Sequence, residues 1–143
     1  MARVRDLMQP NVVTIGPDQP IFEAIKKMAA GKFRRLPVMD KGRLVGIISD
    51  RDLRRALKSP IIMYEKPIAN YLLRETKVGS CMTMHPLTVS PDTDAIEAAG
   101  IMEHKKIGGL PVVEGSRLVG VITLSDLINF LIQAFEENPQ GSG

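Results

Sequence analysis

Apolar and polar residues follow one order twice along this chain of 143 residues. Residues 4–57 align with residues 78–131 at a constant offset of 74 positions without a gap, and 20 of the 54 aligned positions are identical. An internal repeat of this length indicates a fold built from two similar units. We therefore expect the functional site in a cleft between the two copies.

Each copy shows the pattern of five elements in the same order. A short extended run ends at Gly-Pro or Ser-Pro, and residues with one apolar helical face follow it. Asp18 and Asp92 stand near the expected helix starts, where a carboxylate accepts hydrogen bonds from free N–H groups, and Gly31 is an expected helix end. Two strands joined by a tight turn come next, and a second helix begins near Asp50 or Leu124. The expected extended segments are 11–15, 33–39 and 43–49 in the first copy and 86–89, 110–113 and 118–123 in the second.

The order strand, helix, strand, strand, helix predicts an α/β fold of the α+β type. A hairpin flanked by two helices cannot bury its apolar face alone, so the two copies should pack together. Residues 66–73 are expected to form a short helix between them. The expected organisation is a first repeat over 1–57, a linker over 58–77, a second repeat over 78–135 and a disordered tail over 136–143.

Identical positions cluster in two places, each of which contains a short motif. Leu-Pro-Val occurs at residues 36–38 and again at 110–112. Gly-Ile-Ile-Ser-x-x-Asp at residues 46–52 recurs as Gly-Val-Ile-Thr-x-x-Asp at 120–126. With these motifs the chain, up to about Phe135, resembles a tandem CBS-domain pair, also called a Bateman module. Within that family it is most similar to small stand-alone pairs of the acetoin-utilisation type.

The resemblance implies both a fold and a ligand. Two pseudo-twofold-related repeats should pack through their sheets and leave two clefts. In many members a cleft binds an adenosine-containing ligand, an adenine nucleotide such as AMP, ADP or ATP, or S-adenosylmethionine, as a regulatory ligand and not as a required cofactor. The resemblance also implies a homodimer and a regulated partner protein or a further C-terminal domain.

The turn between the second strand and the second helix of each copy is suited to such a ligand. Ser49 and the free N–H groups of the first helical turn can meet a phosphate, and Asp52 can accept hydrogen bonds from a ribose diol. Thr123 and Asp126 repeat this spacing. The spacing also fits a capping box, in which the hydroxyl and the acid bind backbone N–H groups. Both interpretations remain open at this point.

The two copies differ where an anion would be held. Arg34 and Arg35 precede Leu-Pro-Val in the first copy, and Gly108 and Gly109 take their places in the second. A guanidinium group binds phosphate oxygens with paired donors, so these arginines and Arg51 are candidate phosphate ligands. Because side chains alternate along a strand, at most one of Arg34 and Arg35 should face a given cleft. The full set of expected ligand-binding residues is Thr14, Ile15, Arg34, Arg35, Pro37, Ser49, Arg51, Asp52, Thr88, Val89, Gly109, Pro111, Thr123 and Asp126.

Composition narrows the possible functions. No apolar run is long enough to cross a bilayer and the N-terminus lacks a signal peptide, so we expect a cytoplasmic protein without membrane contact. The single Cys81 cannot form an internal disulfide and is expected at a buried apolar position. The sequence contains no recognisable catalytic acid pair, activated nucleophile, metal cluster or phosphate-binding loop, so no enzymatic activity is expected.

Charge is uneven along the chain, although the net charge is only +3. Residues 1–57 carry 12 basic and 6 acidic side chains, and the remainder carries 7 and 10. Aromatic residues make up 4%, which leaves few side chains to stack on bases, so nucleic-acid binding is not expected. The alternative to ligand sensing is a scaffold for dimerisation or partner docking, with the apolar face of the helix from Leu124 to Phe135 as its surface.

Overall fold

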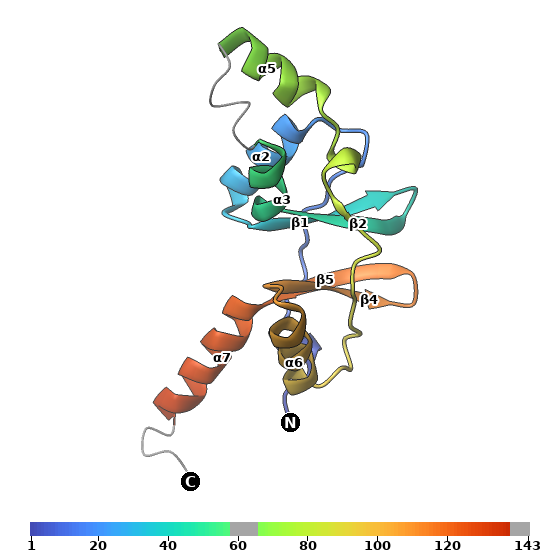
Figure 1. The fold of residues 1–143 in the computed structure, drawn as a ribbon. Helices are drawn as coiled ribbons and strands as arrows, with labels where there is room; N and C mark the ends of the chain where they lie inside the picture. The colour runs from blue at the N-terminus through green and yellow to red at the C-terminus, as the bar shows by residue number, and fades with distance from the viewer. Residues whose placement is uncertain (58–65, 138–143) are drawn as a thin grey trace. The chain divides into compact units, whose positions relative to one another are not determined.

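The computed structural model describes residues 1–57 and 66–137, and the chain divides into two compact units (Figure 1). The central unit is Val13–Pro86, and the terminal unit joins Met1–Val12 to the chain from Leu87 onward. In each unit helices pack on an antiparallel hairpin, which confirms the α+β fold class. No helix in these described ranges is both long enough and apolar enough to cross a membrane.

The central unit contains a three-stranded antiparallel sheet in the order β1-β2-β3. Its first two strands form the expected hairpin, and the two-residue β3 pairs with the other edge of β2. Helix α2 packs on β1, α3 packs on β2, and α5 contacts α2. The elements are α2 (Ile21–Gly31), β1 (Arg35–Asp40), β2 (Arg43–Ser49), α3 (Asp50–Ala56), α5 (Lys66–Glu75), the 3-10 turn η1 (Val78–Ser80) and β3 (Thr83–Met84).

The terminal unit repeats this plan with a two-stranded sheet. Helix α6 packs on β4, α7 packs on β5, and the short α1 contacts both helices. The two hairpins carry a bulge at the same aligned place, after Val38 and after Val112. The elements are α1 (Val4–Leu7), α6 (Ala95–Lys105), β4 (Gly109–Glu114), β5 (Arg117–Thr123) and α7 (Leu124–Glu137).

The short extended run of each repeat adds a parallel bridge to its own hairpin. Ile15 bridges Val38 in the central unit, and Val89 bridges Val112 in the terminal unit. All four side chains are buried in the apolar core of their unit. Of the first element predicted for each repeat, the structure pairs one residue with the hairpin, Ile15 in the central unit and Val89 in the terminal unit.

The opening residues of each sequence repeat pack on the body of the other repeat. Val4 and Val78 are aligned and fully buried, but Val4 lies in the core of the terminal unit and Val78 in that of the central unit. Val4 N donates to Thr93 O and Val78 N donates to Gln19 O, each at 2.8 Å. The compact units are thus offset from the sequence repeats by these exchanged opening segments, residues 1–12 and 76–86.

Two glycines allow the exchanged segments to approach the hairpins closely. A β-carbon on Gly46 of β2 would lie 2.6 Å from Met82 Sδ and 2.9 Å from Thr83 O. At the aligned Gly120 of β5, a β-carbon would lie 2.8 Å from Met8 Sδ. The glycine that opens both copies of the second motif is therefore required by packing, because neighbouring backbone and methionine atoms occupy the space of a side chain.

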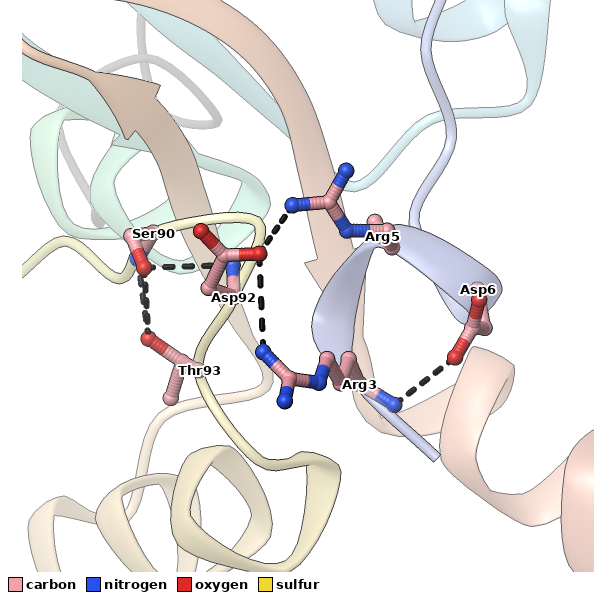
Figure 2. Close-up of polar contacts among 6 residues, drawn as sticks. All are labelled: Arg3, Arg5, Asp6, Ser90, Asp92 and Thr93. Atoms are coloured by element: carbon pink, nitrogen blue, oxygen red, sulfur yellow. Dashed lines mark hydrogen bonds and ion pairs between the residues drawn. The ribbon is translucent and has the colours of Figure 1, made fainter. Parts of the chain in front are cut away.

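Ion pairs fasten the N-terminal segment to the turn before α6 (Figure 2). Arg5 pairs with Asp92, and Arg3 NH1 lies 3.6 Å from Asp92 Oδ1. The aligned pair in the central unit is Lys77 and Asp18, with Nζ and Oδ1 3.8 Å apart. These side chains are exposed, so each pair stabilises its unit by less than about 1 kcal/mol and mainly orients the segment.

The prediction that Asp18 and Asp92 cap the following helices is wrong. Helix α2 begins after Pro20 without a side-chain cap, and α6 begins after Asp94, whose carboxylate accepts a hydrogen bond from Ile96 N at 2.9 Å. In the second copy a turn intervenes, in which Thr93 N donates to the carbonyl of the serine three residues earlier. The two aspartates pair with the basic residues described above instead.

Several predicted boundaries move by a few residues. Helix α2 ends with Gly31, and the residue that follows, Lys32, takes the left-handed conformation with φ 56°. Strand β1 begins at Arg35 and not at residue 33. The linker helix continues to Glu75, beyond the predicted end. Helix α7 extends to Glu137, so residues 136–137 are helical and do not belong to a disordered tail. The rest of the predicted tail, 138–143, lies outside the described residues.

Candidate functional site

Ser49 and Asp52 form a capping box where β2 ends and α3 begins. Asp52 Oδ2 accepts hydrogen bonds from Ser49 N at 2.8 Å and from Ser49 Oγ at 3.0 Å, and Asp52 N donates to Ser49 Oγ at 3.1 Å. Both halves of the reciprocal arrangement are present, so the capping interpretation of this motif is confirmed.

The cap engages only one of the two Asp52 carboxylate oxygens. The other oxygen, Oδ1, lies 3.5 Å from the Thr83 hydroxyl and 3.9 Å from the Arg55 guanidinium. The Asp52 side chain is 7% exposed, whereas that of Arg55 is 69% exposed. Since each carboxylate oxygen has two acceptor positions, Oδ1 retains capacity for a hydrogen bond from a ligand hydroxyl. Capping and ligand binding are thus compatible at this residue.

The first N–H groups of α3 are not free to meet a phosphate, contrary to the expectation from sequence. Asp50 N donates to Arg34 O at 2.8 Å, Arg51 N donates to the Asp50 carboxylate at 2.9 Å, and Asp52 N donates to Ser49 Oγ. Three acceptors account for the difference: a backbone carbonyl, the Asp50 carboxylate and the capping hydroxyl. A phosphate at this turn would therefore need side-chain donors.

Thr123 and Asp126 repeat the cap at the start of α7. Asp126 Oδ2 accepts from Thr123 N at 2.8 Å, and Asp126 N donates to Thr123 Oγ1 at 3.2 Å. The second oxygen differs from its counterpart in the central unit, because Asp126 Oδ1 accepts a hydrogen bond from Gln9 Nε2 at 3.1 Å. Gln9 and Thr83 occupy aligned positions, so the same place in each exchanged segment faces the capping carboxylate.

The predicted basic residues surround the start of β1 and α3. Arg35 is half-buried and pairs with Ser49 in the register of the hairpin, and Arg34 is exposed just before the strand. Arg51 is exposed in the first turn of α3. In the terminal unit Gly109 takes the place of Arg35 opposite Thr123 and is buried. The predicted difference in charge between the copies is therefore located at this turn.

The expected ligand-binding residues of the opening extended runs and of Leu-Pro-Val lie in or beside the cores of their units. Ile15 N donates to Pro37 O at 3.1 Å, and in the second copy Val89 N donates to Pro111 O at 3.1 Å; all four residues are buried. Thr14 is half-buried and its carbonyl accepts from Lys27 Nζ at 2.8 Å, whereas Thr88 is exposed.

Comparison with known sequences identifies this arrangement. The profile of the CBS domain matches residues 4–59 and 78–133, which together make up most of the chain. The chain belongs to the CBS domain family. As the two motifs indicated, it is a tandem CBS pair.

Close relatives match this CBS pair along nearly its whole length. A CBS domain-containing protein of Dictyostelium discoideum is 40% identical over 141 residues, which cover 97% of this chain and 97% of the relative. The crystal structure of a putative acetoin utilization protein from Vibrio cholerae is 31% identical with a TM-score of 0.80, and the match covers 100% of this chain and 99% of that one. The similarity to the acetoin-utilisation type is thus confirmed.

Two further similar structures contain adenosine compounds. That of CBSX2 is a complex with AMP; it is 29% identical, has a TM-score of 0.77, and the match covers 94% of this chain and 98% of that chain. The CBS domain pair of protein MJ0100 is a complex with 5-methylthioadenosine and S-adenosyl-L-methionine. It is 26% identical, has a TM-score of 0.80, and the match also covers 94% of this chain and 98% of that chain.

Four residues near the capping carboxylates and the core edge of the CBS pair were not anticipated from sequence. Arg55 approaches Asp52 because residues three apart share one side of a helix, a spacing that could have indicated it. Lys27 reaches Thr14 from α2. Gln9 and Thr83 reach the caps only through the exchanged segments, which no local pattern reveals. Among the described residues no group of three or more potential metal ligands occurs.

Proposed function

We propose that this CBS pair is a regulatory, non-catalytic module that binds an adenosine-containing ligand at the strand-to-helix turns of its two units. The observation that carries the proposal is Asp52, which uses Oδ2 for the cap of α3 and keeps acceptor capacity on Oδ1. A ribose presents two neighbouring hydroxyl donors, which a carboxylate accepts well. Asp126 is the corresponding residue of a second site.

The candidate ligands are AMP, ADP, ATP and S-adenosylmethionine. Complexes of similar CBS pairs with AMP, or with 5-methylthioadenosine and S-adenosyl-L-methionine, support this choice. The other residues expected from sequence to bind the ligand are proposed as the rest of the site. Because the first N–H groups of α3 already have acceptors, phosphates would be held by side chains, those of Arg51 and of either Arg34 or Arg35.

We further propose that ligand occupancy acts through a cytoplasmic homodimer. A ligand changes the balance between two states of a dimer only if it binds one of them more tightly. The unpaired thiol of Cys81 is compatible with a reducing compartment.

Thermal denaturation with added ligands tests the function. A bound ligand should raise the unfolding midpoint progressively, with stabilisation of about 2.7 kcal/mol at a ligand concentration 100 times Kd. AMP, ADP, ATP, NAD and S-adenosylmethionine should be compared at several concentrations. An unchanged midpoint with all five would contradict the proposed function and favour the scaffold described below.

Replacement of Asp52 by alanine is expected to weaken AMP binding at the central unit at least tenfold. It removes the proposed acceptor for the ribose, and loss of the cap should also lower the free energy of unfolding by about 1 kcal/mol. Calorimetric titration with AMP measures the first effect and urea denaturation the second. Asp126→Ala is the matched variant and should weaken the other site only. Loss of both sites in each variant, or of neither, would refute the assignment.

The alternative function, a ligand-free scaffold for dimerisation or partner docking, is favoured by one observation. Helix α7 exposes a series of large apolar side chains, of which Leu131 and Phe135 are each 64% exposed and Ile132 is 50% exposed. Exposed apolar groups of this kind commonly mark contact surfaces. If α7 forms the dimer contact, Leu131→Gln combined with Ile132→Gln should shift the molecular mass measured by light scattering from dimer to monomer. An unchanged mass would exclude α7 as the dimer contact.

A further inference from the structure

One strand position presents a side chain to the capping carboxylate in each unit. In the terminal unit Gln9 pairs with Val121 through two main-chain hydrogen bonds, N to O at 2.8 Å and O to N at 3.1 Å. In the central unit Thr83 of β3 pairs with Ile47, which aligns with Val121. The backbone thus fixes residues 9 and 83 in equivalent places, and only the side chains differ.

The difference between the two side chains decides how Oδ1 of each aspartate is occupied. The longer Gln9 side chain donates its amide N–H to Asp126 Oδ1 at 3.1 Å. The shorter Thr83 hydroxyl stays 3.5 Å from Asp52 Oδ1, at the outer limit of a hydrogen bond. A neutral amide bound to a carboxylate makes a charge-assisted hydrogen bond, which is stronger than one between neutral groups.

We propose that Gln9 is an internal competitor for the ligand-binding carboxylate of the terminal unit, so that the central unit binds an adenosine ligand more tightly than the terminal unit does. The proposal rests on the function proposed above. A ribose hydroxyl that reaches Asp126 Oδ1 must share this oxygen with the Gln9 amide or displace it, whereas the corresponding contact of Thr83 with Asp52 Oδ1 is weak. The identity of residue 9 or 83 then sets the affinity of its unit.

Burial alone would predict tighter ligand binding at the terminal unit, because Asp126 is half-buried whereas Asp52 is only 7% exposed and less accessible to a ligand. The group nearest to Oδ1 of Asp52 on α3 favours the central unit instead. The Arg55 guanidinium lies 3.9 Å away on a side chain that is 69% exposed, so it can turn into solvent at little cost. Its positive charge would also attract a phosphate, and the aligned residue in the terminal unit is the neutral Asn129.

The competitor can leave without disrupting its unit. Gln9 is exposed, and its backbone pairing with Val121 does not depend on the side-chain amide. Removing the amide should therefore strengthen ligand binding while the segment stays in place. We expect about a tenfold gain, which corresponds to the loss of one competing hydrogen bond to a charged group.

Calorimetric titration with AMP in two single-site backgrounds tests the competition. With Asp52→Ala, only the terminal site remains, and adding Gln9→Ala should tighten AMP binding about tenfold. With Asp126→Ala, only the central site remains, and adding Thr83→Gln should weaken binding by a similar factor because it supplies the competitor there. Asn11→Ala, an exposed substitution in the same segment as Gln9, is the control and should leave both affinities unchanged.

The outcomes separate this inference from the function on which it rests. Unchanged or weaker AMP binding on adding Gln9→Ala, in a protein whose parent binds AMP, overturns the competition and leaves the proposed function intact. Absence of heat from every protein with both AMP and S-adenosylmethionine contradicts the function and the competition together. Equal gains from Gln9→Ala and Asn11→Ala would assign the effect to loosening of the segment and would also overturn the inference.

Discussion

Replacement of Gly46 by alanine is expected to destabilise the CBS pair by about 3 kcal/mol. In an open strand the same change would stabilise, because glycine loses more backbone freedom on folding than alanine does. Here the new β-carbon would lie 2.6 Å from Met82 Sδ and 2.9 Å from Thr83 O. The thioether can move, but the carbonyl belongs to a strand paired with β2, so β3 must shift. Urea denaturation measures the loss.

Two other glycines provide the comparison. Gly120→Ala should cost a similar amount, because its β-carbon would meet Met8 Sδ at 2.8 Å and Gln9 O at 2.9 Å. Gly100 lies within α6, and a β-carbon there would have no neighbouring atom within 4 Å, so Gly100→Ala should stabilise by about 1 kcal/mol through helix propensity. Equal changes in the free energy of unfolding for Gly46→Ala and Gly100→Ala would show that the close approach of β3 to β2 does not require glycine at position 46.

Replacement of Val4 by alanine is expected to destabilise the terminal unit by about 2 kcal/mol, although Val4 belongs to the first sequence repeat. Its side chain is fully buried among residues of the second repeat, including Leu110 and Ile122. Removing two methyl groups there leaves a cavity that the surrounding core fills only in part. Amide hydrogen exchange in β4 and β5 should become about thirtyfold faster, while β1 and β2 should change much less.

The matched variant is Val78→Ala, which should have the opposite distribution. Val78 is also fully buried, and it packs in the core of the central unit. Exchange should then accelerate in β1 and β2 more than in β4 and β5. If Val4→Ala instead loosened β1 and β2, the opening segments would not be exchanged, and each sequence repeat would be a structural unit by itself.

Periodicity and turn residues predicted the hairpins and helices well. The strand β2 begins and ends where the pattern places it, and the tight turns after Asp40 and Glu114 are present. These elements depend on neighbours in sequence, which a pattern contains. Helices α3 and α7 begin at Asp50 and Leu124 as predicted. The starts of α2 and α6 were less accurate, because Asp18 and Asp92 have the spacing of caps but form ion pairs with basic residues far along the chain.

The exchange of opening segments could not be predicted in this way. Val4 and Val78 are identical, and so are Met8 and Met82, so either segment fits either hairpin by local pattern. The choice depends on tertiary contacts. The capping motif is local in sequence and could be predicted with its two interpretations. The contacts of Gln9 and Thr83 with the two carboxylates depend on tertiary structure and could not be predicted.

The exchanged segments make this single chain equivalent to a domain-swapped pair of one-repeat proteins joined end to end. In two separate chains, such an exchange would depend on protein concentration, because each unit would have to bind a segment of a second chain. In one polypeptide the partner segment is always present at the effective concentration that the connecting residues set. Either repeat produced alone would lack the segment that completes its own body, and it would have to fold back its own opening residues or exchange them with another copy. The covalent connection between the repeats is therefore part of what stabilises each unit.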